Sequence, residues 1–133
     1  MGATENPIRA FCEAAIATAP EFKLGEVELE GVTYPVFENA PPTLGALYAH
    51  AAATYGDDTL IVYHDRRMSF AEADAASRQA ADALQRTGVE PGDPVAIAMR
   101  NLPEWMLAYM AITRLGAVAV PMNAWWQTAE LDY

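Results

Sequence analysis

The stretch PVAIAMRNLPEWMLAYMAITRLGAVAVP, residues 94–121, decides the fold of this chain. It begins with the apolar run VAIAM at residues 95–99 and ends with the apolar run AVAVP at residues 117–121. Short runs that are apolar throughout are typical of strands buried on both faces of a sheet. Two such strands joined by a helix form a βαβ unit, in which the strands pair in parallel. The stretch therefore predicts an α/β fold.

The segment between the two apolar runs predicts a helix that ends at about Leu115. Asn101 and Glu104 have the spacing of a capping box, and Pro103 suits the first turn. Gly116 stands where a left-handed residue often ends a helix. We therefore expect a helix that Asn101 caps and that Gly116 terminates.

The residues between 41 and 93 predict two more helices and two short strands. These elements are expected as a helix at 43–55, strands at 59–65 and 66–70 with a turn at 65–66, and a helix at 70–87. Ser69 and Glu72 form a possible capping box for the second helix. Gly88 follows the end of that helix and predicts a left-handed terminator.

The first 40 residues differ in composition from the alanine-rich remainder and are acidic. Asn6 can cap a helix that begins at Pro7 and runs to about Thr18. The stretch EVELEGVTYPVF, residues 26–37, alternates apolar and polar residues on both sides of a glycine, which predicts a hairpin with one apolar and one acidic face. We therefore expect residues 1–40 to form a helix-and-hairpin extension and residues 41–133 to begin a larger domain.

Composition limits the classes of partner. The chain has 133 residues, of which 53% are hydrophobic, and a formal net charge of −10 with a pI of about 4.4. Nucleic acid is therefore a poor partner. Cys12 is the only cysteine, so no internal disulfide can form, and we see neither a convincing signal peptide nor an apolar run long enough to span a membrane. We expect a cytoplasmic protein, with peripheral membrane contact left open.

Most signatures of catalysis are missing from the sequence. No glycine precedes a lysine, so there is no Walker-type phosphate loop, and the glycine spacing excludes a dinucleotide fingerprint. One cysteine cannot form a zinc knuckle. Ser69 and Ser77 are best explained as a helix cap and a helix-interior residue, and neither lies in a nucleophile elbow. No cluster of metal-ligating residues accompanies either histidine.

Two short motifs remain open to a functional interpretation. The dipeptide Trp125-Trp126 follows the second apolar strand, and ligands of parallel α/β sheets bind just beyond the carboxyl ends of strands. The two indoles could line an apolar substrate or cofactor channel, or they could pack against a missing domain or fill the core. Arg66 and Arg67 could contact an anion, although arginines at a hairpin turn are more often simply exposed.

Residues 41–133 resemble the beginning of the acyl-adenylate-forming (AMP-binding) superfamily, which includes acyl-CoA synthetases and fatty-acid–CoA ligases. The stretches GVEPGDPVAI, RNLPEW and LGAVAVPMN occur in the order and spacing of that family. The earlier stretch VTYPVFENAPPTL is similar to the leader of bacterial fatty-acid–CoA ligases. Ala73, Pro94 and Ala124 depart from residues that are common in the family, which leaves the substrate subgroup open.

The resemblance implies the N-terminal portion of the large domain of that fold, with an incomplete sheet. Family members are several-fold longer, so it also implies a truncated piece of an ATP-dependent, AMP-forming acid–CoA ligase for a fatty or other apolar acid. The parent would use a carboxylic acid, ATP, Mg²⁺ and CoA, whereas the piece alone would be an inactive scaffold without a cofactor. Asn123 matches a family asparagine near the CoA and acyl channels, and Trp125 and Trp126 follow it by position.

Two alternatives remain, one within the same superfamily and one of a different class. An acyl-AMP ligase that passes its product to a carrier protein is similar over this region. A non-catalytic interaction module could instead use its exposed sheet edge to pair with another chain or to form a homodimer.

Overall fold

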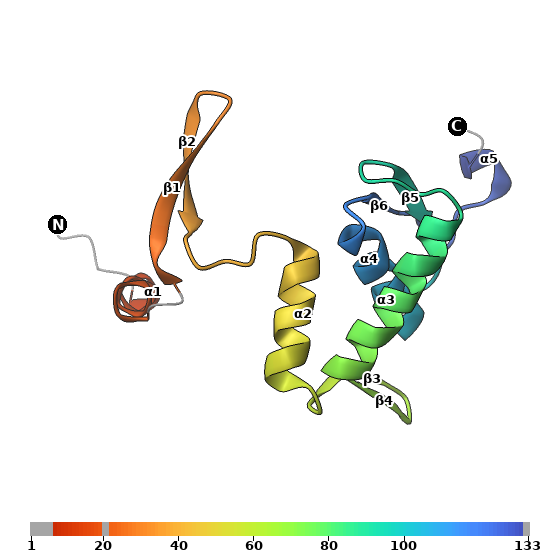
Figure 1. The fold of residues 1–133 in the computed structure, drawn as a ribbon, viewed down its shortest axis with the longest axis horizontal. Coiled ribbons are helices and arrows are strands. Elements are labelled where there is room, and N and C mark those ends of the chain that lie inside the picture. The colour runs from red at the N-terminus through yellow and green to blue at the C-terminus, as the bar shows by residue number, and fades with distance from the viewer. Residues whose placement is uncertain (1–6, 20–21, 132–133) are drawn as a thin grey trace. The chain divides into compact units, whose positions relative to one another are not determined.

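The computed structural model describes residues 7–19 and 22–131, and the chain divides into two compact units, Met1–Pro41 and Pro42–Tyr133 (Figure 1). The division falls within one residue of the predicted boundary between residues 40 and 41. The assignment of these units as separate domains stays a prediction, because domains must also fold independently of each other.

The first unit contains the predicted helix and hairpin. Helix α1 (Pro7–Thr18) is followed by the antiparallel strands β1 (Leu24–Leu29) and β2 (Val32–Phe37). Glu30 and Gly31 form the turn with φ values of 50° and 78°, the left-handed pair that a two-residue hairpin favours. Asn6, the predicted cap of α1, lies outside the described residues.

The predicted apolar face of this hairpin exists but is not covered within the described chain. Its side chains come from alternate positions that pair across the strands, and each is between 36% and 57% exposed: Val27, Leu29, Val32, Tyr34 and Val36. Two strands alone have no second layer on which to bury a face.

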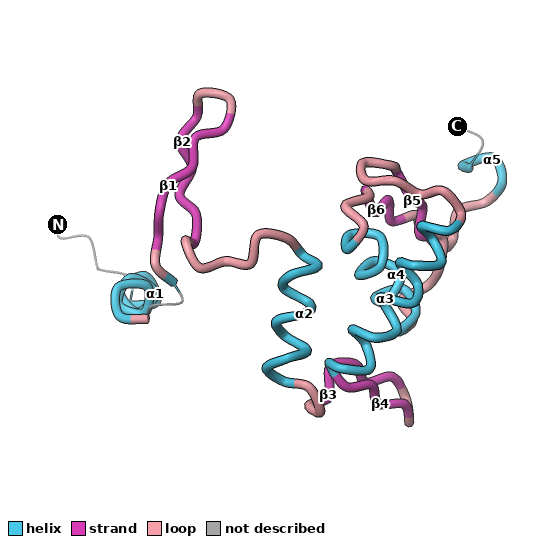
Figure 2. Tube along the Cα trace, viewed as in Figure 1, coloured by secondary structure: helices cyan, strands magenta, loops and turns pink. Residues whose placement is uncertain are grey.

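The second unit contains all the elements that the sequence after residue 41 predicts, including the first turn of a further helix near the end of the chain. In chain order they are α2 (Leu44–Tyr55), β3 (Thr59–Tyr63), β4 (Arg66–Ser69), α3 (Phe70–Arg86), β5 (Pro94–Ile97), α4 (Pro103–Arg114), β6 (Val118–Pro121) and α5 (Thr128–Leu131) (Figure 2). Helices α2, α3 and α4 pack against one another. Strands β3 and β4 form an antiparallel pair. Their turn is at His64–Asp65, one residue earlier than predicted.

The parallel βαβ unit is confirmed. Strands β5 and β6 pair in parallel, with Pro94 opposite Val118 and Ile97 opposite Pro121. Ile97, Ile112 and Ala117 form the buried core where α4 covers the strands. This sheet has only two strands in the described chain, in agreement with the incomplete sheet that was expected.

The expectation that these strands are buried on both faces is wrong for this chain. Val118 is 52% exposed and Val120 is 36% exposed. These side chains point away from the core formed with α4, and the described residues supply no layer on that side. The apolar sequence of β6 therefore includes a face that no layer covers within the described residues.

One of the two predicted capping boxes forms. The Ser69 hydroxyl accepts a hydrogen bond from the Glu72 backbone at 3.2 Å, and the Glu72 carboxylate accepts one from the Ser69 backbone at 2.8 Å. The box at Asn101 is wrong, because Leu102 is the N-cap of α4 and makes no side-chain cap bond. Pro103 is the first residue of α4, since its fixed φ suits that position.

Candidate functional site beyond strands β5 and β6

The two loops that leave β5 and β6 lie beside each other. The Met122 N–H donates to the Ile97 carbonyl at 3.1 Å, which extends the strand pairing by one step. A cavity of about 480 Å³ opens there between the loops and the start of α4. It is lined by Met99, Arg100, Asn101, Trp105, Pro121, Met122, Asn123, Ala124 and Trp125. This is the side of a parallel pair on which α/β proteins bind ligands, and we refer to it as the strand-end cavity.

Asn123 shapes the loop after β6. Its side-chain Oδ1 accepts a hydrogen bond from the Trp125 N–H at 3.0 Å, and its backbone carbonyl accepts one from the Trp126 N–H at 3.1 Å. An asparagine that bonds to the backbone two residues further on makes an Asx-turn. Asn123 therefore fixes the turn that presents the two tryptophans.

The two tryptophans have different environments. Trp125 is 70% exposed and lines the strand-end cavity, whereas Trp126 is 41% exposed and is not one of the lining residues. The interpretation of Trp125 as a core residue is therefore wrong for the described chain. The structure brings together Asn123 and Trp125, two of the three predicted site residues, at the strand-end cavity.

Arg100 is a member of this cavity that sequence analysis missed. Its guanidinium carbon lies 4.8 Å from the centre of the Trp125 ring, within the range of a cation–π contact. A signal was available, because Arg100 directly follows the apolar run of the first strand. Its charge supplies a cation to a site in a chain that is otherwise strongly acidic.

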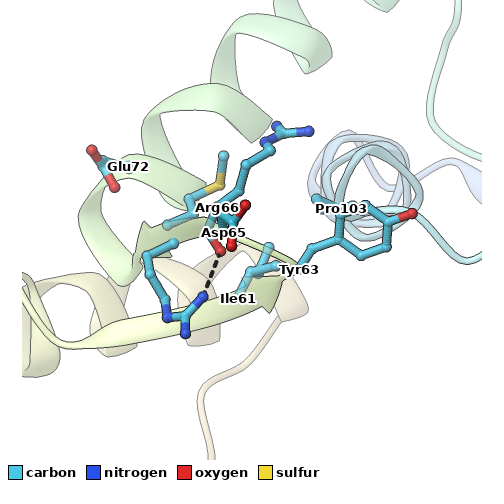
Figure 3. Close-up of a pocket in the computed structure, with 8 residues that line it drawn as sticks. Ile61, Tyr63, Asp65, Arg66, Glu72 and Pro103 are labelled. Atoms are coloured by element: carbon cyan, nitrogen blue, oxygen red, sulfur yellow. Dashed lines mark hydrogen bonds between the residues drawn. The ribbon is translucent and has the colours of Figure 1, made fainter.

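The arginines at the turn of the β3–β4 hairpin already have partners. They line a separate cavity of about 450 Å³ beside Pro103 (Figure 3). The Arg66 guanidinium pairs with the Glu104 carboxylate at 2.9 Å, and Arg67 donates to the backbone carbonyls of His64 and Arg66 at 2.9 and 3.2 Å. A hydrogen bond from its own backbone lowers the pKa of Glu104, and the pairing with Arg66 lowers it further. Both arginines thus serve the local structure.

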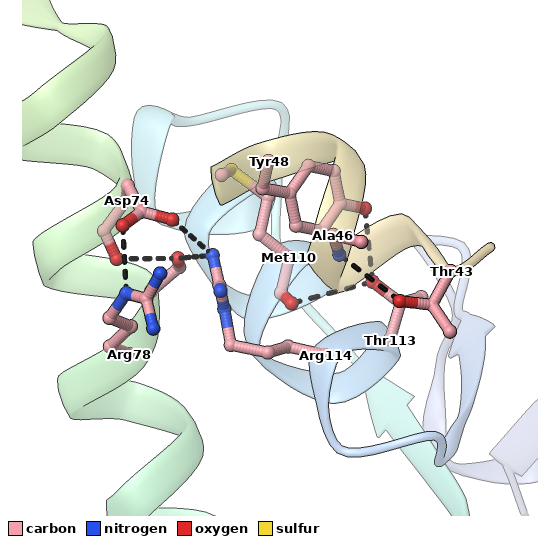
Figure 4. A network of polar contacts seen from close by, with 9 residues as sticks. Thr43, Ala46, Tyr48, Asp74, Arg78, Met110, Thr113 and Arg114 are labelled. Atoms are coloured by element: carbon pink, nitrogen blue, oxygen red, sulfur yellow. Dashed lines mark hydrogen bonds and ion pairs between the residues drawn. The ribbon is translucent and has the colours of Figure 1, made fainter. Parts of the chain in front are cut away.

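A partly buried ion pair ties α3 to α4, the helix that joins the two loops (Figure 4). The Asp74 carboxylate accepts hydrogen bonds from Arg114 at 2.5 Å and from Arg78 at 2.7 Å. Arg114 also donates to the Ser77 hydroxyl at 3.2 Å. Ser77 is fully buried, so its predicted structural role is confirmed. Burial raises the pKa of Asp74, but hydrogen bonds and charges from Arg78 and Arg114 outweigh it and hold this pKa below its ordinary value.

Helix α2 joins this network through Tyr48. The Arg114 guanidinium carbon lies 5.6 Å from the centre of the Tyr48 ring. The Tyr48 hydroxyl and the Thr113 hydroxyl lie 3.0 Å apart in a hydrogen bond. Side chains from α2 and α3 therefore converge on the last residues of α4 and fix its position.

The described residues contain no group of three or more His, Cys, Asp or Glu side chains that could hold a metal ion. Among the helices formed by residues 7–19 and 22–131, none is long and apolar enough to cross a membrane.

Comparison with known proteins identifies the family. The sequence model described as AMP-binding enzyme matches residues 48–133, about two-thirds of the chain. The chain therefore belongs to the AMP-binding enzyme family, as the resemblance predicted.

Two similar proteins are named as an acyl-CoA synthetase and a CoA ligase. YngI of Bacillus subtilis (strain 168), a candidate acyl-CoA synthetase, is 41% identical over 93 residues, which are 68% of this chain and 17% of YngI. The medium/long-chain-fatty-acid–CoA ligase FadD6 of Mycobacterium tuberculosis is 34% identical over 85 residues, which are 64% of this chain and 14% of FadD6. The chain thus spans about a sixth of the length of these relatives.

Solved structures support the same assignment of the fold. The N-terminal domain of FACL13 from Mycobacterium tuberculosis, solved with a bound inhibitor, matches with a TM-score of 0.64 and 31% identity. The match covers 67% of this chain and 23% of that domain. The fold is therefore α/β and belongs to the N-terminal portion of an adenylate-forming enzyme, as predicted.

Proposed function

We propose that this chain is the N-terminal part of an ATP-dependent, AMP-forming acid–CoA ligase that acts on a fatty or other apolar carboxylic acid. The observation that carries the proposal is the family match over residues 48–133, together with relatives named as acyl-CoA synthetases and CoA ligases. FadD6, named as a medium/long-chain-fatty-acid–CoA ligase, supports the apolar acid.

The proposed reaction has two steps. A carboxylate oxygen of the acid attacks the α-phosphorus of ATP, and pyrophosphate leaves, so that an acyl-adenylate forms. The CoA thiol then loses its proton to a base, and the resulting thiolate attacks the acyl carbon and displaces AMP. The first step demands stabilisation of negative charge on the phosphates, which Mg²⁺ provides in many phosphoryl-transfer enzymes.

The contribution of this chain to that reaction is a scaffold and one wall of a channel. We propose that Asn123, Trp125 and Trp126 belong to the CoA or acyl channel, with Arg100 beside them. The geometry in favour is the position of three of them, Arg100, Asn123 and Trp125, at the strand-end cavity. An arginine suits a phosphate of CoA, and an exposed indole offers a flat apolar surface. The proposed role of Trp126 is supported only by its position in the loop.

The test of the reaction uses the native protein, captured from its source with an antibody against this chain. The expected result is exchange of labelled pyrophosphate into ATP that depends on an added fatty acid, followed by formation of acyl-CoA when CoA is present. Exchange without any acyl-CoA would favour transfer to a carrier protein instead. A native protein that shows no exchange with any carboxylic acid would overturn the proposal.

The test of the channel uses the Trp125→Ala variant of the same native protein. We expect the KM for CoA or for the acid to rise about tenfold, which corresponds to about 1.4 kcal/mol of lost binding, while the KM for ATP stays unchanged. Leu29→Ala is the matched control, because it also removes an exposed apolar side chain but in the first unit. Unchanged KM values for both CoA and the acid would remove Trp125 from the site.

A further inference from the structure

We draw no further inference here: the strongest candidate, the half-open apolar cavity of about 440 Å³ between α2, α4 and the start of α3, lined in part by Leu47, Phe70, Trp105 and Met106, carries nothing because no feature of the described residues shows what covers it.

Discussion

At the scale of single residues, Asp74 and Arg114 form a contact that depends on both partners being present. Their side chains are each only 13% exposed, so water cannot replace a lost partner fully. Their positions are 40 residues apart in sequence, and neither lies in a motif, so sequence analysis had no means to pair them. The packing of α3 against α4 creates the pair.

Asp74→Asn should therefore destabilise the chain. The substitution keeps the side-chain shape but leaves the partly buried Arg114 charge without its anion. We expect a loss of about 2 kcal/mol in the free energy of unfolding, between the values for exposed and for buried ion pairs. Urea unfolding followed by circular dichroism measures the loss. The control is Arg78→Ala, which removes a partner that is 53% exposed and should cost less than about 1 kcal/mol. Equal losses for the two variants would contradict the assignment.

The contribution of Asp74 should also depend on pH. Because the arginines hold the folded-state pKa of Asp74 below its ordinary value of 3.8, its stabilisation is fully present above that ordinary value. It is lost as the pH falls through the folded-state pKa, where the carboxylate becomes protonated. The stability difference between wild type and Asp74→Asn should thus be large at pH 7 and should shrink below about pH 4. A difference that stayed constant down to pH 2 would rule out this linkage.

At the scale of the element, the first residues of α3 and α4 show that the same capping pattern predicts one helix start correctly and the other wrongly. Ser69–Glu72 and Asn101–Glu104 have the same spacing, yet only the first forms a capping box. The difference comes from Pro103, which begins α4 one residue later than the box requires. Asn101 is then free to line the strand-end cavity.

Substitution of the two predicted cap residues, Ser69 and Asn101, should have different effects on stability. Ser69→Ala removes the acceptor for the Glu72 backbone N–H and should cost about 1 kcal/mol of stability. Asn101→Ala removes no cap bond and should change stability by less than about 0.5 kcal/mol. Thermal and urea unfolding of both variants measures the effects. A loss at Asn101 as large as that at Ser69 would show that α4 is capped in solution as the sequence pattern suggested.

At the scale of the whole molecule, sequence analysis predicted the order of the main elements, the parallel strand pair and the side of the sheet that holds the candidate site. These features follow from local periodicity and from the connection rules of α/β folds. Arg100 was missed because a single arginine after the first strand is not distinctive in sequence, whereas the tryptophan pair after the second strand is. The open face of β5 and β6 was missed because apolar composition records what a strand can bury and does not show which layer covers it.

The division into two units predicts separate folding. A chain of residues 42–133 should keep the circular dichroism and urea midpoint of the second unit, because α2, α3 and α4 pack within that unit. The control is a chain of residues 57–133, which lacks α2 and with it the Tyr48 contacts to Thr113 and Arg114. It should unfold at a clearly lower urea concentration. A collapse of the 42–133 chain to the same extent would refute the boundary near residue 41.

The geometry of the strand-end cavity limits where the chain can gain or lose residues. Its two walls, residues 99–101 and 121–125, are joined by α4, whose 12 residues set the distance and rotation between them. Deleting one residue from an α-helix shortens it by about 1.5 Å and rotates everything beyond it by about 100°. Such a deletion within α4 would turn Arg114 away from Asp74 and would also shift β6 relative to β5. Exposed residues of α4 can therefore be substituted, but we expect insertions and deletions to be tolerated only in the loops on either side of this helix.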